Sequence, residues 1–290
     1  MYKKILACVD GSFNAEAVAK YAINIAQACK AEIHVVCVIE KGVHPNAVAI
    51  SFERLAQMAE KDNIPFHTHF LYGDVVSQIV HLVKKESIEL VLSSVRRVDW
   101  QGRFFVKSLP QKLMLVLPCS VIAVRVVGYR GSVKRILVPL RSWKYYFYER
   151  LYLLSFFALT FSTELVIFRV QEIPQDKAGV FSSKEIPRLK KIGEKEIVFF
   201  TEGLAELGVN VKSKVKISTN LPRAILFEAA RGRYDLIFMG AYQRDIVKRA
   251  IEGNLVEEVL RNTPCDMMIW YPKTRRLRPF WQKIFKIFKF

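Results

Sequence analysis

Two histidines, His67 and His69, stand two positions apart in a short run of the sequence. We predict a β-strand over residues 66–71, on which both imidazoles would share one face and could together bind a metal ion. No carboxylate or cysteine at ligand spacing accompanies them in the sequence, and two ligands do not make a metal site. The pattern therefore favours an ordinary strand surface, and we predict no metal.

Sequence motifs for covalent catalysis and for phosphate binding are missing. The chain contains no Gly-x-Ser-x-Gly elbow, no cysteine with an obvious histidine partner and no P-loop. Five cysteines are present, at Cys8, Cys29, Cys37, Cys119 and Cys265. They lack Cys-x-x-Cys spacing and most stand inside apolar runs, which indicates reduced, buried thiols of a cytosolic protein. We therefore predict that the protein is not an enzyme.

The last eighteen residues, 273–290, contain seven Lys or Arg and no acid. At about 100° per residue, their large apolar side chains would share one side of a helix and their lysines the other. Such a cationic, aromatic-rich amphipathic helix lies in the headgroup plane of an anionic membrane. We predict that it contacts a membrane surface or an integral membrane protein complex. The contact residues would be Phe280, Trp281, Lys283, Ile284, Phe285, Lys286 and Phe288.

Two other uses of this tail stay open. Its aromatic side would also fit a groove on the body of the protein, with the lysines facing solvent, or the groove of a partner that captures amphipathic helices. Three or four buried rings at roughly 1.5 kcal/mol each, with about 1 kcal/mol for each cation near anionic headgroups, favour reversible membrane attachment.

Positive charge is concentrated at this end of the chain. The formal net charge of +18 divides into +5 for residues 1–130, +6 for residues 131–272 and +7 for the tail. Because no recognisable motif for reading nucleic acid accompanies the tail, we predict no nucleic-acid partner. The sequence opens without a secretory signal, and its longest apolar stretch, residues 151–161, is about half of the roughly 20 residues that span a bilayer. We predict no transmembrane helix and a cytoplasmic protein, peripheral to the inner face of the cell membrane.

The remainder of the chain alternates short apolar runs with helical stretches, and this order occurs twice. Strands are predicted over residues 4–9, 32–39, 66–71, 88–93 and 120–126, and again over 135–140, 165–170, 209–217, 236–239 and 267–271. Continuous apolar strands separated by helices indicate a parallel sheet covered on both faces. The predicted class is α/β, with two tandem doubly wound domains, 1–128 and 133–272, followed by the basic amphipathic tail, 273–290. A repeat of this length indicates tandem domains rather than one large sheet.

Residues 143–161 are predicted to form a helix that carries large rings around nearly its whole circumference. One side must cover a sheet, and the other must meet the second domain, another subunit or a membrane protein. Packing between the two domains is favoured, and a homodimer stays open.

Several stretches carry a family likeness. They are the opening run 3–12 and the run 235–240 with Gly253, Asn254 and the dipeptide Pro264-Cys265. Through them the chain resembles the universal stress protein family in its tandem two-domain form, over residues 1–272. The resemblance implies the adenine-nucleotide alpha hydrolase-like fold. The family contains members that bind ATP and members that do not.

In that family, an acid at the end of the first strand contacts adenosine, and a loop patterned Gly-x2-Gly-x9-Gly-Ser/Thr after the fourth strand holds the phosphates. Glycines let the backbone approach phosphate oxygens, and the following helix offers unpaired amides. In the first copy the resemblance assigns the acid to Asp10. Ser93 and Arg96 replace the first two glycines, and Lys107-Ser108 replaces Gly-Ser one residue late. Apart from nucleotide contact, Asp10 would serve to cap the turn into the next helix.

In the second copy the loop keeps Gly240, Gly253 and Asn254, but Arg141 stands in the place of the acid. An arginine cannot accept hydrogen bonds from a ribose. Neither copy therefore has the complete set. The cofactor-binding candidates are Asp10, Gly240, Gly253 and Asn254. We predict no cofactor, with ATP or AMP as the alternative.

The sequence thus predicts a non-catalytic accessory or regulatory protein of the universal-stress type, attached through its C-terminal helix to the cytoplasmic face of the membrane or to a membrane protein complex. The alternative is an adenine-nucleotide-binding stress sensor, with at most slow hydrolysis.

Overall fold

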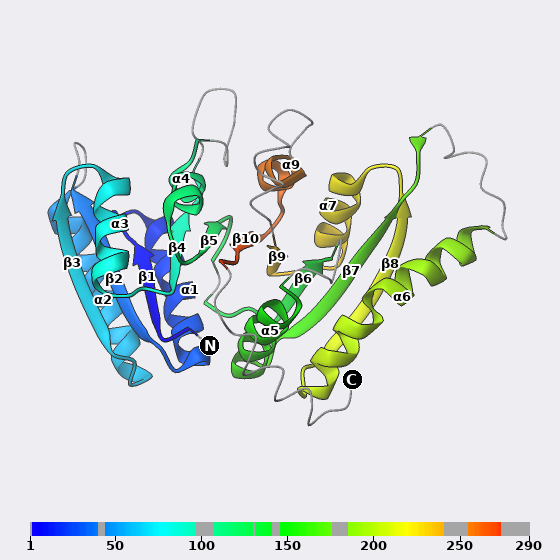
Figure 1. Ribbon diagram of the computed structural model, residues 1–290, viewed down its shortest axis with the longest axis horizontal. Helices are drawn as coiled ribbons and strands as arrows, with labels where there is room; N and C mark the ends of the chain where they lie inside the picture. The colour runs from blue at the N-terminus through cyan, green and yellow to red at the C-terminus, as the bar shows by residue number, and fades with distance from the viewer. Residues whose placement is uncertain are drawn as a thin grey trace.

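A computed structural model of the chain describes residues 2–39, 44–96, 107–129, 131–140, 146–175, 185–240 and 255–273. Within these residues lies one ten-stranded sheet, in the order β3-β2-β1-β4-β5-β10-β9-β6-β7-β8, with helices on both faces (Figure 1). Neighbouring strands run parallel throughout except at the centre, where β5 and β10 are antiparallel.

The first half of the chain builds one side of this sheet. Its elements are β1 (Lys4–Cys8), α1 (Phe13–Cys29), β2 (Glu32–Ile39), α2 (Pro45–Lys61), β3 (Phe66–Tyr72), α3 (Val75–Lys85), β4 (Leu90–Ser94), α4 (Leu109–Val116) and β5 (Ser120–Arg125). Three of the helices begin at a residue whose side-chain oxygen accepts a hydrogen bond from a backbone N–H of the first turn: Ser12, Asp74 and Ser108.

The second half repeats the plan. Its elements are β6 (Arg135–Pro139), α5 (Phe147–Phe161), β7 (Glu164–Glu172), α6 (Glu185–Glu206), β8 (Val211–Ser218), α7 (Leu221–Arg231), β9 (Leu236–Gly240), α9 (Leu255–Asn262) and β10 (Asp266–Tyr271). Strand order is 3-2-1-4-5 in one half and 8-7-6-9-10 in the other, which is one topology used twice. The predicted doubly wound α/β class is confirmed.

The expectation of two separate sheets is wrong. Strand β5 pairs with β10 over five residue pairs, from Val121 with Tyr271 to Arg125 with Met267, so the two halves share one sheet. Both strands are buried along nearly their whole length. Each would otherwise present an unpaired, apolar edge, and pairing the two edges satisfies both rows of backbone hydrogen-bonding groups.

The core forms two layers, one on each face of the sheet. On one face α1, α2, α5 and α6 cover strand side chains that include Ile5, Ile136 and Trp270. On the other face α3, α4, α7 and α9 cover side chains that include Leu6 and Leu137. Alternate residues of each strand therefore face opposite layers, as the period of a strand requires.

Helix α5 meets the other half of the molecule. It contacts α1 of the first half and α6 of its own half, which confirms the predicted packing between the two halves for this aromatic helix. Leu151, Leu154 and Phe157 are buried, whereas Phe156 and Leu159 stay exposed on its outer side. Among the described residues, no helix combines the length and apolar composition needed to cross a membrane.

Polar contacts also join the halves. Tyr21 of α1 donates a hydrogen bond of 2.7 Å to Oδ2 of the buried Asp266 at the start of β10. Asp266 Oδ1 accepts from the backbone N–H groups of Val127 and Gly128, at 2.7 and 2.9 Å. Three donors thus hold one buried carboxylate. Burial raises the pKa of Tyr21, and the negative charge of Asp266 raises it further.

Candidate functional site

The carboxyl ends of β1 and β4 meet where the strand order reverses, which is the place where ligands bind in doubly wound sheets. Asp10 follows β1 at this edge. Its Oδ1 accepts hydrogen bonds from the N–H and the Oγ–H of Ser12, at 3.1 and 2.7 Å, and Ser12 in turn caps α1. The intervening Gly11 has φ +80°, and a Cβ there would lie 3.1 Å from Ala47 Cβ. Asp10 therefore does cap the turn into the helix.

Arg96 occupies the remaining oxygen of Asp10. It follows β4, and its guanidinium donates to Asp10 Oδ2 and also, at 2.6 Å, to Ser12 Oγ. The side chains of Asp10 and Arg96 are 33% and 47% exposed, so the pair lies at the surface of the edge. The sequence identified Arg96 as a residue that replaces a glycine of the phosphate loop. It did not reveal that this arginine satisfies the acid of the same site.

The last part of the first phosphate loop keeps a glycine-like backbone without a glycine. Lys107 has φ +65°, in the left-handed region that favours glycine. Ser108 follows as the cap of α4, where its Oγ accepts from Gln111 N–H at 3.4 Å. The residues between Arg96 and Lys107 lie outside the described part of the chain.

In the second half, Gly240 ends β9 at the corresponding edge. The guanidinium of Arg150, from the first turn of α5, lies directly against it: a Cβ added at Gly240 would be 2.6 Å from Nη2 and 3.0 Å from Cζ of Arg150. Arg150 is only 4% exposed. A side chain at this position would have to displace the buried guanidinium, so packing against Arg150 favours glycine here.

The other predicted site residues are not described. Gly253 and Asn254, and Arg141 in the place of the acid, lie outside the described residues. The same holds for the predicted membrane or partner contacts of the tail: Phe280, Trp281, Lys283, Ile284, Phe285, Lys286 and Phe288. Their roles stay predictions from the sequence.

All five cysteines are free, and four of them are held as protonated thiols. Burial raises the pKa of Cys8 and of Cys265 to about 12, and that of Cys29 and of Cys37 to about 11. A thiol that stays protonated at neutral pH is a poor nucleophile.

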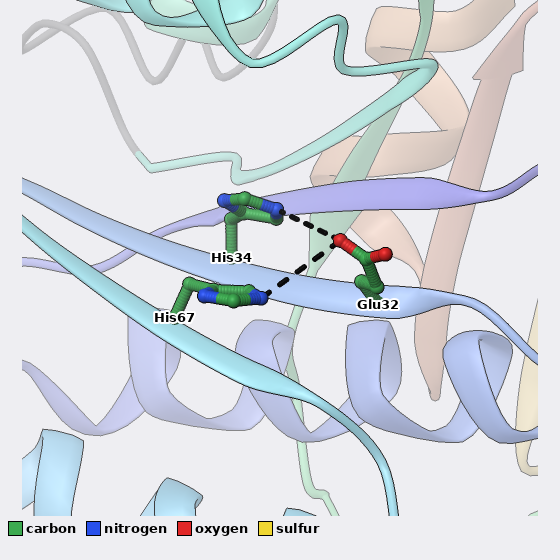
Figure 2. Close-up of side chains that lie close together, drawn as sticks. All are labelled: Glu32, His34 and His67. Carbon is green, nitrogen blue, oxygen red and sulfur yellow. Dashed lines mark ion pairs between the residues drawn. The ribbon is translucent and has the colours of Figure 1, made fainter.

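A cluster that the sequence did not predict lies on β2 and β3, where β3 is an edge strand of the sheet. His34 of β2 stands opposite His67 of β3 in the parallel pairing, and Glu32 precedes His34 by two positions. Figure 2 shows the two rings stacked, each with a nitrogen directed at the carboxylate of Glu32. The sequence showed no carboxylate at ligand spacing from His67 and His69, but the structure brings Glu32 of the neighbouring strand to within 3.8 Å of His67. The signal was present as two i, i+2 patterns, Glu32 with His34 and His67 with His69, on strands that prove to be neighbours.

These features define the class: a tandem doubly wound α/β protein, with a reversal of strand order in each half. The sequence profile of the universal stress protein family matches residues 1–125 and 151–270, and the chain therefore belongs to the universal stress protein family. The resemblance seen in the sequence is confirmed. Membership places the chain among stress-type regulatory or nucleotide-binding proteins.

Individual relatives are distant. A universal stress protein of Methanocaldococcus jannaschii is 24% identical over 141 residues, which are 43% of this chain and 83% of the relative. A solved universal stress protein of Archaeoglobus fulgidus aligns with 93% of this chain and 96% of its own, with a TM-score of 0.61 at 18% identity.

Two further solved structures share the complete tandem fold. A protein from Pseudomonas aeruginosa that is described as functionally unknown has a TM-score of 0.65 at 16% identity, over 94% of this chain and 93% of its own. The cytoplasmic domain of a prokaryotic cation chloride cotransporter has a TM-score of 0.61 at 8% identity, over 94% and 96%. At these identities the likeness concerns the fold alone.

Proposed function

We propose that this protein is a non-catalytic, regulatory member of its family, an accessory subunit held at the cytoplasmic face of a membrane or on a membrane protein complex. The observation that carries the proposal is the pairing of Asp10 with Arg96 and Ser12. The acid that would receive adenosine is already satisfied by side chains of the same chain. A ligand would have to displace a guanidinium in order to use it.

The second half supports the same conclusion by a different route. Arg150 covers the backbone at Gly240, the position where a phosphate loop would begin. An arginine thus lies at the ligand edge of each half, once from the end of a strand and once from a helix. These two arginines support a role in which the protein acts through contact with a partner rather than through a bound nucleotide.

Attachment through the tail is supported by its composition, with seven cations over residues 273–290 and six large apolar side chains over residues 280–288. The fold itself is compatible with such a position, since the cotransporter domain that shares it belongs to the cytoplasmic part of a membrane protein. The attached chain would present its two-domain body to a neighbouring membrane protein.

Vesicle flotation tests the attachment. The intact chain is compared with one that ends at Lys273, which keeps the hydrogen bond of 3.1 Å from Lys273 N–H to Ser120 Oγ. We expect the intact chain to float with anionic vesicles and the shortened chain to stay behind. A matched variant, with Lys283, Lys286 and Lys289 changed to Gln, should lose preference for anionic over neutral lipid. Equal flotation of intact and shortened chains would contradict attachment to lipid.

A nucleotide sensor is the second candidate, and the exposure of the Asp10–Arg96 pair favours it. Exposed ion pairs contribute only about 0–1 kcal/mol, so a ribose could displace Arg96 from Asp10, and the freed guanidinium could then bind a phosphate. Calorimetry with ATP and AMP separates the candidates. The regulatory proposal expects no saturable binding at millimolar nucleotide by the wild type, and a gain on Arg96→Ala. The sensor expects wild-type binding that Asp10→Ala abolishes.

A further inference from the structure

We propose that Glu32, His34 and His67 form a binding site for one zinc ion, at the edge of the sheet between β2 and β3. This site lies on two strands of the first half and uses neither Asp10 nor the tail. Three ligands from a carboxylate and two imidazoles, with one position left for water, are a set that zinc accepts in proteins.

The three ligand atoms already converge. Oε2 of Glu32 lies 3.8 Å from Nε2 of His34 and 3.8 Å from Nε2 of His67, and all three lie within 4.8 Å of one another (Figure 2). Around tetrahedral zinc with bonds of about 2.0–2.1 Å, ligand atoms stand about 3.3–3.4 Å apart. The side chains of His67 and Glu32 are 49% and 40% exposed, so both can turn to close this difference.

His34 provides the strongest indication. It is only 2% exposed, and its Nε2 has no hydrogen-bond partner among the described residues. A buried polar atom without a partner costs free energy, and buried nitrogens are as a rule satisfied. A metal ion between Nε2 and the carboxylate of Glu32 would satisfy both groups.

His69 provides a hydrogen-bond partner for the outer nitrogen of His34. His34 Nδ1 and His69 Nε2 lie 3.0 Å apart, and the two rings are stacked with planes 8° apart. When His34 carries its proton on Nδ1 and donates it to His69, the lone pair of His34 is on Nε2, facing Glu32. Hydrogen bonds from the outer nitrogen of a ligating histidine commonly set the ring in this way.

One cation competes for the same carboxylate. Lys4 Nζ, on the neighbouring strand β1, lies 3.5 Å from Glu32 Oε2. Its side chain is 34% exposed and its partner 40%, so the pair is weak and the lysine can move into solvent. Removing this lysine should therefore strengthen metal binding.

Titration of the metal-free, full-length chain with Zn²⁺ tests the site, by calorimetry and by competition with a chromophoric chelator. We expect one equivalent per chain, a higher Tm with zinc, and at least a roughly 100-fold loss of affinity on Glu32→Gln or His67→Gln. These two positions are partly exposed, so the variants should fold. His69→Phe keeps the stacked ring and should weaken binding about tenfold. Lys4→Met should strengthen it several-fold, and His81→Gln on α3 is the matched control, without effect.

Substitution of Co²⁺ identifies the ligands directly. Nitrogen and oxygen ligands give the visible bands of tetrahedral cobalt without a thiolate charge-transfer band. A thiolate band, or affinity that Glu32→Gln and His67→Gln leave unchanged, would place the ion elsewhere and overturn the proposal. Failure of the wild type to bind zinc at micromolar concentration would overturn it equally.

Discussion

At the positions of the proposed zinc site, the two halves of the molecule place different side chains around an equivalent carboxylate. By the strand register, Glu32, His34 and His67 of the first half correspond to Glu164, Val166 and Lys212 of the second. Glu164 accepts from Lys212 Nζ at 2.5 Å and from Arg135 Nε at 2.9 Å. Both halves place a cation of the first strand beside the carboxylate, Lys4 at 3.5 Å from Glu32 and Arg135 at 2.9 Å from Glu164. The second half adds the ammonium group of Lys212, whereas the first half adds the imidazoles of His34 and His67. A duplicated fold can therefore keep an acid in place while changing the groups that surround it.

The two halves also differ at the carboxyl ends of their central strands, where the arginine comes from a different element in each half. In the first half the arginine comes from the end of β4 and pairs with Asp10, while in the second it comes from α5 and lies on Gly240. The strand register aligns Ser94, rather than Ser93, with Gly240, so a residue with a Cβ stands where the second half needs a glycine. The comparison indicates that an arginine can reach this edge of the sheet either from the end of a strand or from a helix.

The largest expected effect on the free energy of unfolding is at the pairing of β5 with β10, which joins the two halves. Asp266 and Ser120 occupy equivalent first positions of β10 and β5, but Asp266 is a buried carboxylate with three donors. We expect Asp266→Ala to lower the free energy of unfolding by about 4 kcal/mol, since Tyr21 and two backbone N–H groups lose their acceptor. Ser120→Ala should cost about 1 kcal/mol. Urea unfolding of both variants measures the contrast, and equal losses would contradict it.

Lowering the pH should reduce the stability contributed by the Glu32 and Glu164 clusters in different pH windows. Burial lowers the pKa of His34 to about 4 from 6.5, so in metal-free protein the unfolded chain takes up the proton first. Stability is then fully present above about pH 6.5 and falls by about 3 kcal/mol as the pH approaches 4. The pKa of Glu164 is lowered, chiefly by Lys212 and then by Arg135, so its contribution is lost only below its ordinary 4.5. Charged or titrating groups around His34 are Glu32, His67, His69, Lys4 and Glu86.

Unfolding free energies between about pH 7 and 4, measured with chelator present, check this prediction. An NMR titration of the His34 ring in the folded protein is independent of any variant. A ring that protonates near its ordinary pKa of 6.5 would contradict the expected window.

Exchanging Gly240 at the end of β9 with the equivalent Ser94 at the end of β4 should change the free energy of unfolding by an intermediate amount. Gly240→Ser brings in the side chain of the first half, but its Cβ would meet Arg150 at 2.6 Å. We expect a loss of about 2 kcal/mol from overpacking. Ser94→Gly, the reverse exchange, should cost less than about 1 kcal/mol. In an Arg150→Met background the added cost of Gly240→Ser should vanish, and a double-mutant cycle measures this coupling.

The smallest effect is expected in the loop before α4. Lys107 adopts φ +65°, and its counterpart before α9 is Gly253. Lys107→Gly should raise the free energy of unfolding by up to about 1 kcal/mol, because glycine adopts this conformation without a Cβ clash. Thermal unfolding checks the sign, and a lower Tm would show that the lysine side chain contributes more than the backbone strain costs.

Much of the fold was predictable from local pattern. Apolar runs of strand length separated by helical stretches indicated the α/β class, and most element ends fall within a few residues of their predicted positions. The joining of β5 to β10 was not predictable in this way. Nothing in either strand's own residues specifies which edge it meets, because pairing depends on how the two halves pack.

The candidate sites were likewise predictable in part. Asp10 and Gly240 were assigned through the family resemblance, which short runs of the sequence carry. The neutralisation of Asp10 by Arg96 and the contact of Gly240 with Arg150 could not be predicted, because each arginine comes from an element far away along the chain. The histidines were noticed as a pair on one strand, while their carboxylate lies on another.

The amino-acid sequence by itself determined the repeated α/β plan, the strand faces, the helix caps and the cationic, aromatic-rich composition of the tail, because each depends on residues within a few positions of one another. The tertiary structure decided the single sheet, the arginine at each ligand edge and the meeting of Glu32 with two imidazoles. These features depend on strand register and helix packing, which bring together side chains that are distant in sequence.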